Sequence, residues 1–215
     1  PPPGPHRPPV PAAPAVTRFA PIRHAETVWN REKRIQGHQD SPLTPEGEMM
    51  ADRWGLTLRV FHWDRILASD TGRATATARR INTRLQLPME LDPRLRELDW
   101  GRWTTKTLAQ LRQEEGDLLA IQERAGWDFQ PPQGESRRGQ LARCRRTLLE
   151  FADRYPGDSI LVVTHGGVIK CLANSLPDSG PPAADEIGAS SYRLLWLAAA
   201  AGRLSPGGRN ALVLP

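Results

Sequence analysis

The chain has 215 residues, enough for one substantial domain or two small ones. Hydrophobic residues make up 39% of it, and no apolar run approaches the roughly 20 residues that span a bilayer, so we expect no membrane partner. The net charge of +5 suits a small anionic partner, but the positive residues are scattered along the chain, which argues against nucleic acid.

Residues 1–16 read PPPGPHRPPVPAAPAV, a stretch of low complexity. Because proline has no N–H donor and restricts the backbone, we predict a disordered, Pro-rich tail there. A proline-rich ligand for another protein is the alternative. No charged region followed by an apolar core is found near the N-terminus, so we expect no secretory signal and a cytoplasmic protein.

After the tail, residues 17–215 are interpreted as a single domain. TRFAPIRH (17–24) predicts a first strand, and the segment 41–60 predicts a turn and a helix. DRILASD (64–70) predicts a second strand, followed by a helix over 71–85.

The second half continues the alternation of strands and helices. Its predicted elements are a strand or extended loop over 92–101, helices over 104–125 and 135–155, a buried parallel strand DSILVVTH over 158–165, a helix over 166–176, and late strands within 191–215 joined by a Gly/Pro turn. Strands that alternate with helices favour an α/β domain with a mainly parallel sheet.

Cys144 and Cys171 are the only cysteines, and their spacing matches no metal-ligand motif. Both fall in predicted helices, where we expect buried, reduced thiols; a disulfide between them is the alternative. The sequence also lacks an HExxH motif, an EF-hand pattern and a Walker lysine. We therefore predict neither a metal nor a cofactor.

Two of the five histidines end predicted strands. His24 follows the apolar run FAPIR, and His165 follows SILVVT and precedes two glycines, of which Gly166 is the first. In parallel sheets, ligands bind beyond the carboxyl ends of the strands, so we expect both imidazoles in one crevice. Arg73, in the first turn after the second strand, and Glu97, in RELDWG, are predicted to join them.

The motifs RHAETVWN, QGHQDSPLTPEG, ASDTGRATATA, RLRELDWGRW, GES and VVTHGG occur in the order and spacing of the histidine phosphatase superfamily. Over about residues 18–174 the chain resembles this phosphoglycerate-mutase-like family. The resemblance implies a three-layer α/β/α sandwich whose mainly parallel central sheet has the first strand near its centre. It also implies an enzyme acting on a small phosphorylated substrate.

The resemblance assigns roles to individual residues. It implies a nucleophile at His24 that becomes phosphohistidine, phosphate clamps at Arg23 and Arg73, a second pocket histidine at His165, and a proton donor at Glu97. It implies substrate-binding positions at Asn30, Gln36, Gly37 and Gly166.

The chemistry of a phosphate monoester fits these residue types. Two guanidinium groups neutralise the phosphate, and they also disfavour a protonated, positively charged His24, leaving a neutral imidazole as nucleophile. Glu97 can protonate the leaving alkoxide and then take a proton from the attacking water. A solvated salt bridge from Glu97 to Arg94 or Arg96 is the alternative for this carboxylate.

Two positions depart from the usual pattern. The family commonly has Gly after the nucleophile, where this chain has Ala25, so the backbone there cannot need a strongly left-handed conformation. Pro21 lies inside the first strand, and proline cannot donate to a sheet ladder. We predict a bulge or a missing hydrogen bond at Pro21.

The family contains both phosphatases and mutases. Mutases carry a tyrosine in the acid motif and an Arg-Arg-x-Tyr element in the insertion that follows. Here the tyrosines, Tyr155 and Tyr192, lie outside that region, and only 30 residues separate Trp103 from Gly134. We therefore favour a phosphatase over a mutase, which is the alternative. The sequence leaves the oligomeric state open, with a homodimer as one outcome.

Overall fold

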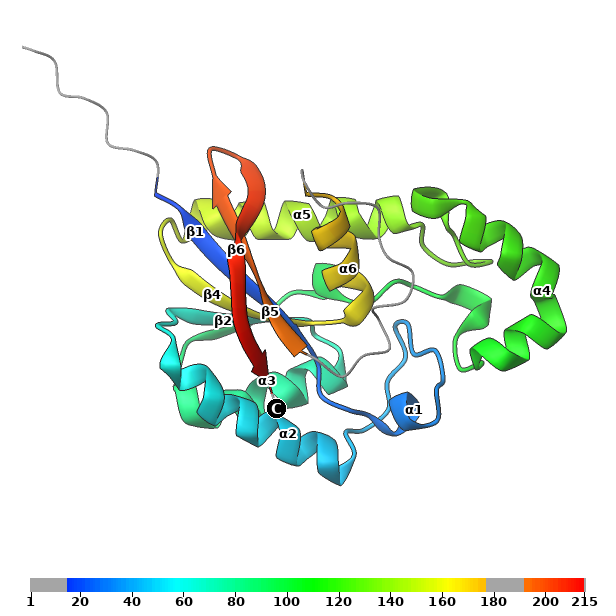
Figure 1. The fold of residues 1–215 in the computed structure, drawn as a ribbon, viewed down its shortest axis with the longest axis horizontal. Coiled ribbons are helices and arrows are strands. Elements are labelled where there is room, and N and C mark those ends of the chain that lie inside the picture. Colours follow the sequence, from blue (N-terminus) through cyan, green and yellow to red (C-terminus); the bar gives the residue numbers. More distant parts are fainter. Residues whose placement is uncertain (1–14, 177–191, 215) are drawn as a thin grey trace, which may run out of the picture.

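The computed structural model describes residues 15–176 and 192–214, so the tail predicted over 1–16 lies almost wholly outside the described residues. Within these ranges the strands form a six-stranded sheet in the order β3-β2-β4-β1-β5-β6 (Figure 1). The strands are β1 (Thr17–Arg23), β2 (Arg65–Ala68), β3 (Met89–Leu91), β4 (Ser159–Thr164), β5 (Tyr192–Ala200) and β6 (Arg203–Leu214). Strands β1 to β4 are parallel to one another, whereas β5 and β6 are antiparallel additions at one side.

The helices fill the connections between these strands. They are α1 (Val28–Arg31), α2 (Pro45–Thr57), α3 (Gly72–Leu85), α4 (Leu108–Arg124), α5 (Arg137–Arg154) and α6 (Gly166–Asn174), with short 3-10 turns at Leu58–Val60, Pro93–Leu95, Gly101–Trp103 and Gly126–Asp128. Figure 1 shows α2 and α3 at the lower side of the strands and α5 along the upper side.

Successive side chains of the central strands enter two different cores, because neighbours along a strand point to opposite faces. Ala20 and Ile22 of β1 pack in a cluster with residues of α2 and α3. Phe19, the residue before Ala20, points to the other face and packs in a second cluster with residues of α5 and α6. The two helix pairs therefore cover opposite faces of the sheet, and the predicted three-layer α/β/α sandwich is confirmed.

Pro21 lies in the central strand β1, between β4 and β5. The backbone N–H groups of Arg18 and His24 both donate toward β4, so the nitrogen of Pro21, an odd number of residues away, faces the other side. Pairing with β5 ends at Phe19. The register with β4 runs unbroken through Pro21. The missing N–H of Pro21 thus faces the β5 side, where pairing has already ended, and no hydrogen bond to β4 is lost. The alternative, a bulge, does not occur.

The structure corrects the prediction for residues 92–101. This segment is neither a strand nor fully extended, because Pro93 begins a 3-10 turn and Asp92 Oδ1 accepts a hydrogen bond from Arg94 N at 2.8 Å. The strand in this region is β3, just before the turn, and the sequence does not predict it. A three-residue edge strand that pairs only with β2 carries too little apolar pattern to be recognised.

Helix α4 carries a small core of its own, separate from the two that flank the sheet. Its buried members are Leu98, Trp103, Leu111, Leu119 and Phe129. The helix begins with a capping box in which Thr107 and Gln110 bond reciprocally. This cluster fixes the segment after Glu97 as a rigid neighbour of the strand ends. None of the described helices combines the length and the apolar character that a membrane crossing requires.

Candidate active site

His24 follows the last residue of β1 and is only 3% exposed. Its backbone N–H donates to Thr164 O at 2.8 Å, which extends the ladder with β4 by one rung. Its Nδ1 lies 2.8 Å from the carbonyl oxygen of Ala25. Because a carbonyl can only accept, Nδ1 carries the proton and Nε2 keeps its lone pair. Burial, followed by the charges of Arg23 and Arg73, holds the pKa of His24 well below its usual 6.5.

His165 follows β4 and is fully buried at the start of α6. Its ring centroid lies 5.3 Å from that of His24, so the structure brings the two predicted histidines together. Arg73 Nη2 donates to His165 Nδ1 at 3.2 Å. The proton therefore sits on Nε2, which donates to Ser69 Oγ at 3.0 Å. Burial, followed by neighbouring positive charge, lowers the pKa of His165 well below the usual range.

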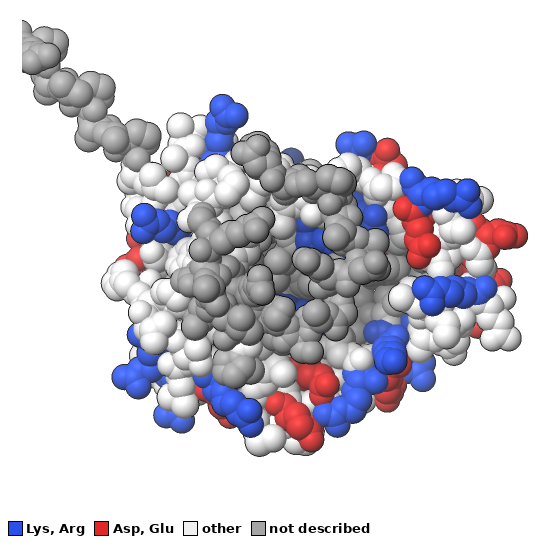
Figure 2. All heavy atoms as spheres, in the orientation of Figure 1, with Lys and Arg blue, Asp and Glu red and all other residues white. Residues whose placement is uncertain are grey.

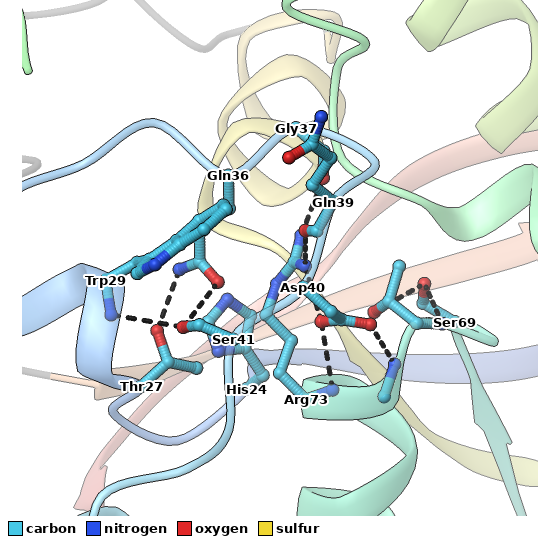
Figure 3. Close-up of polar contacts among 12 residues, drawn as sticks. His24, Thr27, Trp29, Gln36, Gly37, Gln39, Asp40, Ser41, Ser69 and Arg73 are labelled. Atoms are coloured by element: carbon cyan, nitrogen blue, oxygen red, sulfur yellow. Dashed lines mark hydrogen bonds and ion pairs between the residues drawn. The ribbon is translucent and has the colours of Figure 1, made fainter. Parts of the chain in front are cut away.

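Arg73, the second residue of α3, has a side chain only 1% exposed. Figure 3 shows its guanidinium between His24 and the loop that contains Gly37 and Gln39. Nη1 donates to Gln39 O at 2.7 Å and to Asp40 Oδ1 at 2.8 Å, and Nη2 donates to Gly37 O at 2.8 Å as well as to the second histidine. The buried Nε has no hydrogen-bond partner among the described residues. Arg73, predicted to clamp phosphate, thus uses both of its Nη groups to hold the loop and His165, and only its Nε–H remains free.

Asp40 caps the N-terminus of α3 from a distant part of the chain. The side chain of Thr71, at the N-cap position, makes no capping hydrogen bond. Instead, the carboxylate of Asp40 accepts hydrogen bonds from the backbone N–H groups of Gly72 and Arg73. One side chain therefore fixes both the helix start and the guanidinium of Arg73.

Arg23 and Gly166 lie beside each other next to His24. Arg23 is half-buried, and within the described ranges its side chain makes no hydrogen bond or ion pair. A Cβ added to Gly166 would lie 3.6 Å from Arg23 Cδ, an ordinary contact distance. The free guanidinium therefore adjoins the first residue of α6, whose N-terminus favours negative charge. The charge on this side of the pair of histidines therefore favours an anion.

Glu97 lies in the loop between the turn at Pro93–Leu95 and the turn at Gly101–Trp103. Its Oε1 accepts from Leu98 N at 2.8 Å and from Gln140 Nε2 at 3.0 Å. Its Oε2 accepts from Gly167 N at 3.0 Å, which places the carboxylate at the start of α6, next to His165.

The alternative of a salt bridge from Glu97 is not observed. Arg94 pairs instead with Asp92 and Glu150. Arg96 pairs with Asp70. The carboxylate of Glu97 is thus bound by neutral donors and stays next to the histidines.

Arg143, in α5, holds the backbone of the Glu97 segment. Its Nη1 donates to Arg94 O at 2.6 Å and to Arg96 O at 2.8 Å, and its Nη2 donates to Glu97 O at 3.0 Å. A bidentate ion pair with Glu135, with distances of 2.7 and 2.8 Å, fixes the guanidinium. Glu135 thus anchors, through Arg143, the backbone around Glu97, which we call the acid segment.

Gln36 and Gly37 belong to the loop that Arg73 holds. Gln36 is buried, and its amide donates to Thr27 Oγ1 at 2.8 Å and accepts from Ser41 Oγ at 3.4 Å (Figure 3). Gly37 has a φ of +53° and lies so close to the segment after Glu97 that an added Cβ would meet Trp100 N at 3.2 Å. In this structure both residues shape the loop, while substrate contact by either stays a prediction.

Asn30 lies in the single turn of α1. Its Oδ1 accepts from Thr27 N at 3.2 Å, and its own backbone N–H donates to Thr27 Oγ1 at 3.1 Å. This reciprocal capping box fixes the turn that follows His24. The side-chain oxygen of Asn30 is therefore engaged, and a contact to substrate stays a prediction.

Comparison with the sequence models of known protein families gives a match over most of the chain. The model of the histidine phosphatase superfamily (branch 1) matches residues 21–205. The chain belongs to the histidine phosphatase superfamily. The match includes His24, His165 and the segment that carries Glu97.

Individual members of the superfamily differ in their activities. "Probable phosphoglycerate mutase GpmB" of Enterobacter sp. (strain 638) is 37% identical over 155 residues, which are 72% of this chain and 72% of that protein. The solved structure of Bacillus stearothermophilus YhfR is 32% identical, with a TM-score of 0.74, and covers 89% of this chain and 95% of its own. Mycobacterial glucosyl-3-phosphoglycerate phosphatase in complex with VO3 is 28% identical, with a TM-score of 0.74, and covers 91% and 99%. The similar proteins thus include both a mutase by name and a phosphatase.

In this member of the superfamily, the sequence does not predict the roles of three residues near the histidines: Asp40, Gln140 and Arg143. Each acts on a partner more than 30 positions away, so no local pattern reveals it. Among residues 15–176 and 192–214, no three His, Cys, Asp or Glu side chains are placed to hold a metal ion. The described site is a cluster of two neutral imidazoles, two guanidiniums and one carboxylate.

Proposed function

We propose that this chain is a phosphomonoesterase that hydrolyses a small phosphorylated metabolite through a phosphohistidine on His24. The observation that carries the proposal is the tautomer of His24. Its Nδ1 is occupied by the carbonyl of Ala25, and its lowered pKa keeps the ring neutral, so Nε2 is a nucleophile at neutral pH.

The surroundings of His24 suit a phosphoryl group. Arg23 has no competing partner, and Arg73 keeps an unpaired, buried Nε–H, so both can donate to phosphate oxygens. The Nε2–H of His165 is engaged by Ser69 and its Nδ1 accepts from Arg73, so neither nitrogen is free to donate to the transferring group. Its proposed role is therefore to hold Arg73 in place, with donation to phosphate only after an exchange of partners.

Glu97 is proposed to transfer the proton. In the first step Nε2 of His24 bonds to phosphorus, the bond to the leaving oxygen breaks, and Glu97 protonates that oxygen. In the second step the oxygen of water attacks phosphorus, the bond between phosphorus and His24 Nε2 breaks, Glu97 takes a proton from the water, and phosphate leaves. The position of Glu97 at the start of α6, bonded to Gly167 N, supports this role.

The choice of a phosphatase over a mutase rests on the positions of the tyrosines, since mutases carry tyrosines in the segment around the acid and in the insertion that follows. Tyr155 binds Glu90 of the edge strand β3 with its hydroxyl at 2.6 Å, and Thr17 Oγ1 binds its carbonyl. Tyr155 therefore lies at the amino ends of the strands, away from His24; the side chain of Tyr192 lies outside the described residues. The side chains of α4 that are buried, Leu111 and Leu119, face its own core. The likeness to glucosyl-3-phosphoglycerate phosphatase also supports hydrolysis.

A substrate panel tests this proposal. The purified chain is assayed for phosphate release from sugar phosphates, nucleotides and phosphoglycerates, and in parallel for 2,3-bisphosphoglycerate-dependent isomerisation of 3-phosphoglycerate. We expect release of phosphate from at least one monoester and no efficient isomerisation. Efficient isomerisation without hydrolysis of any compound would establish the mutase instead.

A further inference from the structure

Gln140 is a buried amide on the mainly apolar inward face of α5. It is 1% exposed and lies one helical turn before Cys144 and two turns before Leu148, which belong to the core under the sheet. An apolar side chain at such a position packs without any polar requirement, whereas a buried amide is costly unless both of its ends are bonded. In Gln140 both ends are bonded, and one of the partners is the carboxylate of Glu97.

The direction of these hydrogen bonds follows from the donors available. The thiol of Cys171, in α6, lies 3.2 Å from Gln140 Oε1 and donates to it. Gln140 Nε2 then donates to Glu97 Oε1 at 3.0 Å. A flipped amide would set its oxygen against the carboxylate, so the carboxylate selects this orientation, and the thiol proton of Cys171 reinforces it by binding the amide oxygen. Burial raises the pKa of Cys171 to about 11, so the thiol keeps the proton that it donates at neutral pH.

This arrangement makes the two oxygens of Glu97 unequal. Oε1 accepts two hydrogen bonds, from Leu98 N and from Gln140. Oε2 accepts one, from Gly167 N. A proton on Oε1 would compete with two fixed donors, whereas Oε2 retains room for it.

We propose that Gln140, whose orientation Cys171 reinforces, is a positioning residue that holds the Glu97 carboxyl with its transferable proton on Oε2. The inference rests on the proposed role of Glu97 as proton donor and names the residues that make that role directional. It assigns Gln140 no contact with substrate. Loss of Gln140 is therefore expected to matter only where the leaving group needs a proton.

Two substrates separate proton donation from general damage to the site. An alkyl phosphate from the panel leaves as a strongly basic alkoxide, while p-nitrophenyl phosphate leaves as a stable phenolate that needs no proton. Because kcat/KM covers the steps up to departure of the leaving group, we compare its value for both substrates. Glu97→Gln is the reference variant and is expected to lower kcat/KM at least about 100-fold for the alkyl phosphate only.

Gln140→Leu is expected to lower kcat/KM about tenfold for the alkyl phosphate, the size of one hydrogen bond to a charged group, and less than about twofold for p-nitrophenyl phosphate. Cys171→Ala is expected to lower the ratio of kcat/KM for the alkyl phosphate to kcat/KM for p-nitrophenyl phosphate, but less than Gln140→Leu does. Cys171→Ser keeps a hydrogen-bond donor and is expected to have the wild-type ratio. Cys144→Ala is the matched control, since its thiol donates to Arg94 O and not to this chain of bonds. Its ratio should equal that of the wild type.

Equal losses on both substrates in Gln140→Leu, or no loss on either, would overturn the inference. If Gln140→Leu does not fold, Cys171→Ala and Cys171→Ser are compared instead. Identical ratios of kcat/KM on the two substrates in these two variants would overturn the inference. A Glu97→Gln variant that affects both substrates alike would instead contradict the proposed function. A selective Glu97→Gln with an unselective Gln140→Leu would remove this inference alone.

Discussion

His24 and His165 carry their protons on different nitrogens, and backbone and side-chain neighbours decide which. The carbonyl of Ala25 keeps the proton of His24 on Nδ1, and the guanidinium of Arg73 keeps that of His165 on Nε2. Ala25 has no positive φ, as expected for a residue other than glycine, and its N–H donates to Thr77 Oγ1 at 3.0 Å. The difference in tautomer gives the two histidines different proposed tasks, nucleophile and support.

Gly167 tests the placement of Glu97 by sterics alone. A Cβ at Gly167 would overlap Glu97 Oε1, whereas one at Gly166 makes only an ordinary contact with Arg23. We expect Gly167→Ala to displace the carboxylate and to lower kcat on an alkyl phosphate by about 100-fold or more. The movable carboxylate end can give way, so the urea midpoint should change little. Gly116→Ala, in α4, is the control because an added Cβ there meets nothing within 4 Å, and an equal loss in both variants would contradict this placement.

At the scale of elements, α3 presents Arg73 because Asp40 holds the start of the helix. The carboxylate joins the loop after Gly37 to α3 by two backbone hydrogen bonds and one ion pair of 2.8 Å. The same loop reaches the acid segment, where His38 Nε2 donates to Glu97 O at 3.0 Å. Loop, helix start and acid segment thus form one connected support.

Asp40→Ala is expected to lower the free energy of unfolding by about 1–2 kcal/mol, as for the loss of a helix cap, and to reduce kcat/KM because Arg73 loses its anchor. Asp52→Ala is the control, since Asp52 makes a 2.9 Å ion pair with Arg80 at the exposed surface of α2. Such surface pairs contribute about 0–1 kcal/mol, so a smaller change is expected there. Urea denaturation gives both values, and equal destabilisation would argue against the capping role.

The sequence predicts those elements whose pattern is local. The strands that end in His24 and His165 are apolar runs that stop at polar residues, and Thr44 lies at the N-cap of α2 as a motif of Thr before Pro predicts. Both free cysteines are buried, as expected. The short strand β3, and the support from Gln140 and Arg143, depend on contacts between distant segments. No periodicity in the chain reports such contacts.

At the scale of the whole molecule, charged side chains of both signs are spread over the surface displayed in Figure 2, and two guanidiniums lie close to the pair of histidines. Figure 2 shows Lys and Arg scattered among Asp and Glu on the displayed face. The absence of a nucleic-acid partner, the cytoplasmic location and the homodimer stay predictions. Near the histidines, two guanidiniums face rings that burial keeps neutral, so folding itself opposes protonation of these rings.

This opposition predicts how stability depends on pH. Below about pH 6.5 the unfolded histidines bind protons while the buried ones do not, so the unfolded state holds more protons and stability falls as pH falls. Each histidine contributes at most about 1.4 kcal/mol per pH unit in this window. Urea denaturation at pH 7.5, 6.5 and 5.5 measures the slope, and His24→Asn should reduce it. A variant with the same slope as the wild type would rule out His24 as a source.

The central claim is that His24 becomes phosphorylated during turnover, and trapping the phosphoenzyme tests it most directly. The protein is mixed with p-nitrophenyl phosphate, quenched in alkali within milliseconds and digested, and the phosphopeptides are identified by mass spectrometry. We predict an acid-labile phosphate on the peptide that contains His24, and none in His24→Ala. Phosphate that persists in His24→Ala, or that is found on a different residue of the wild type, would contradict the account.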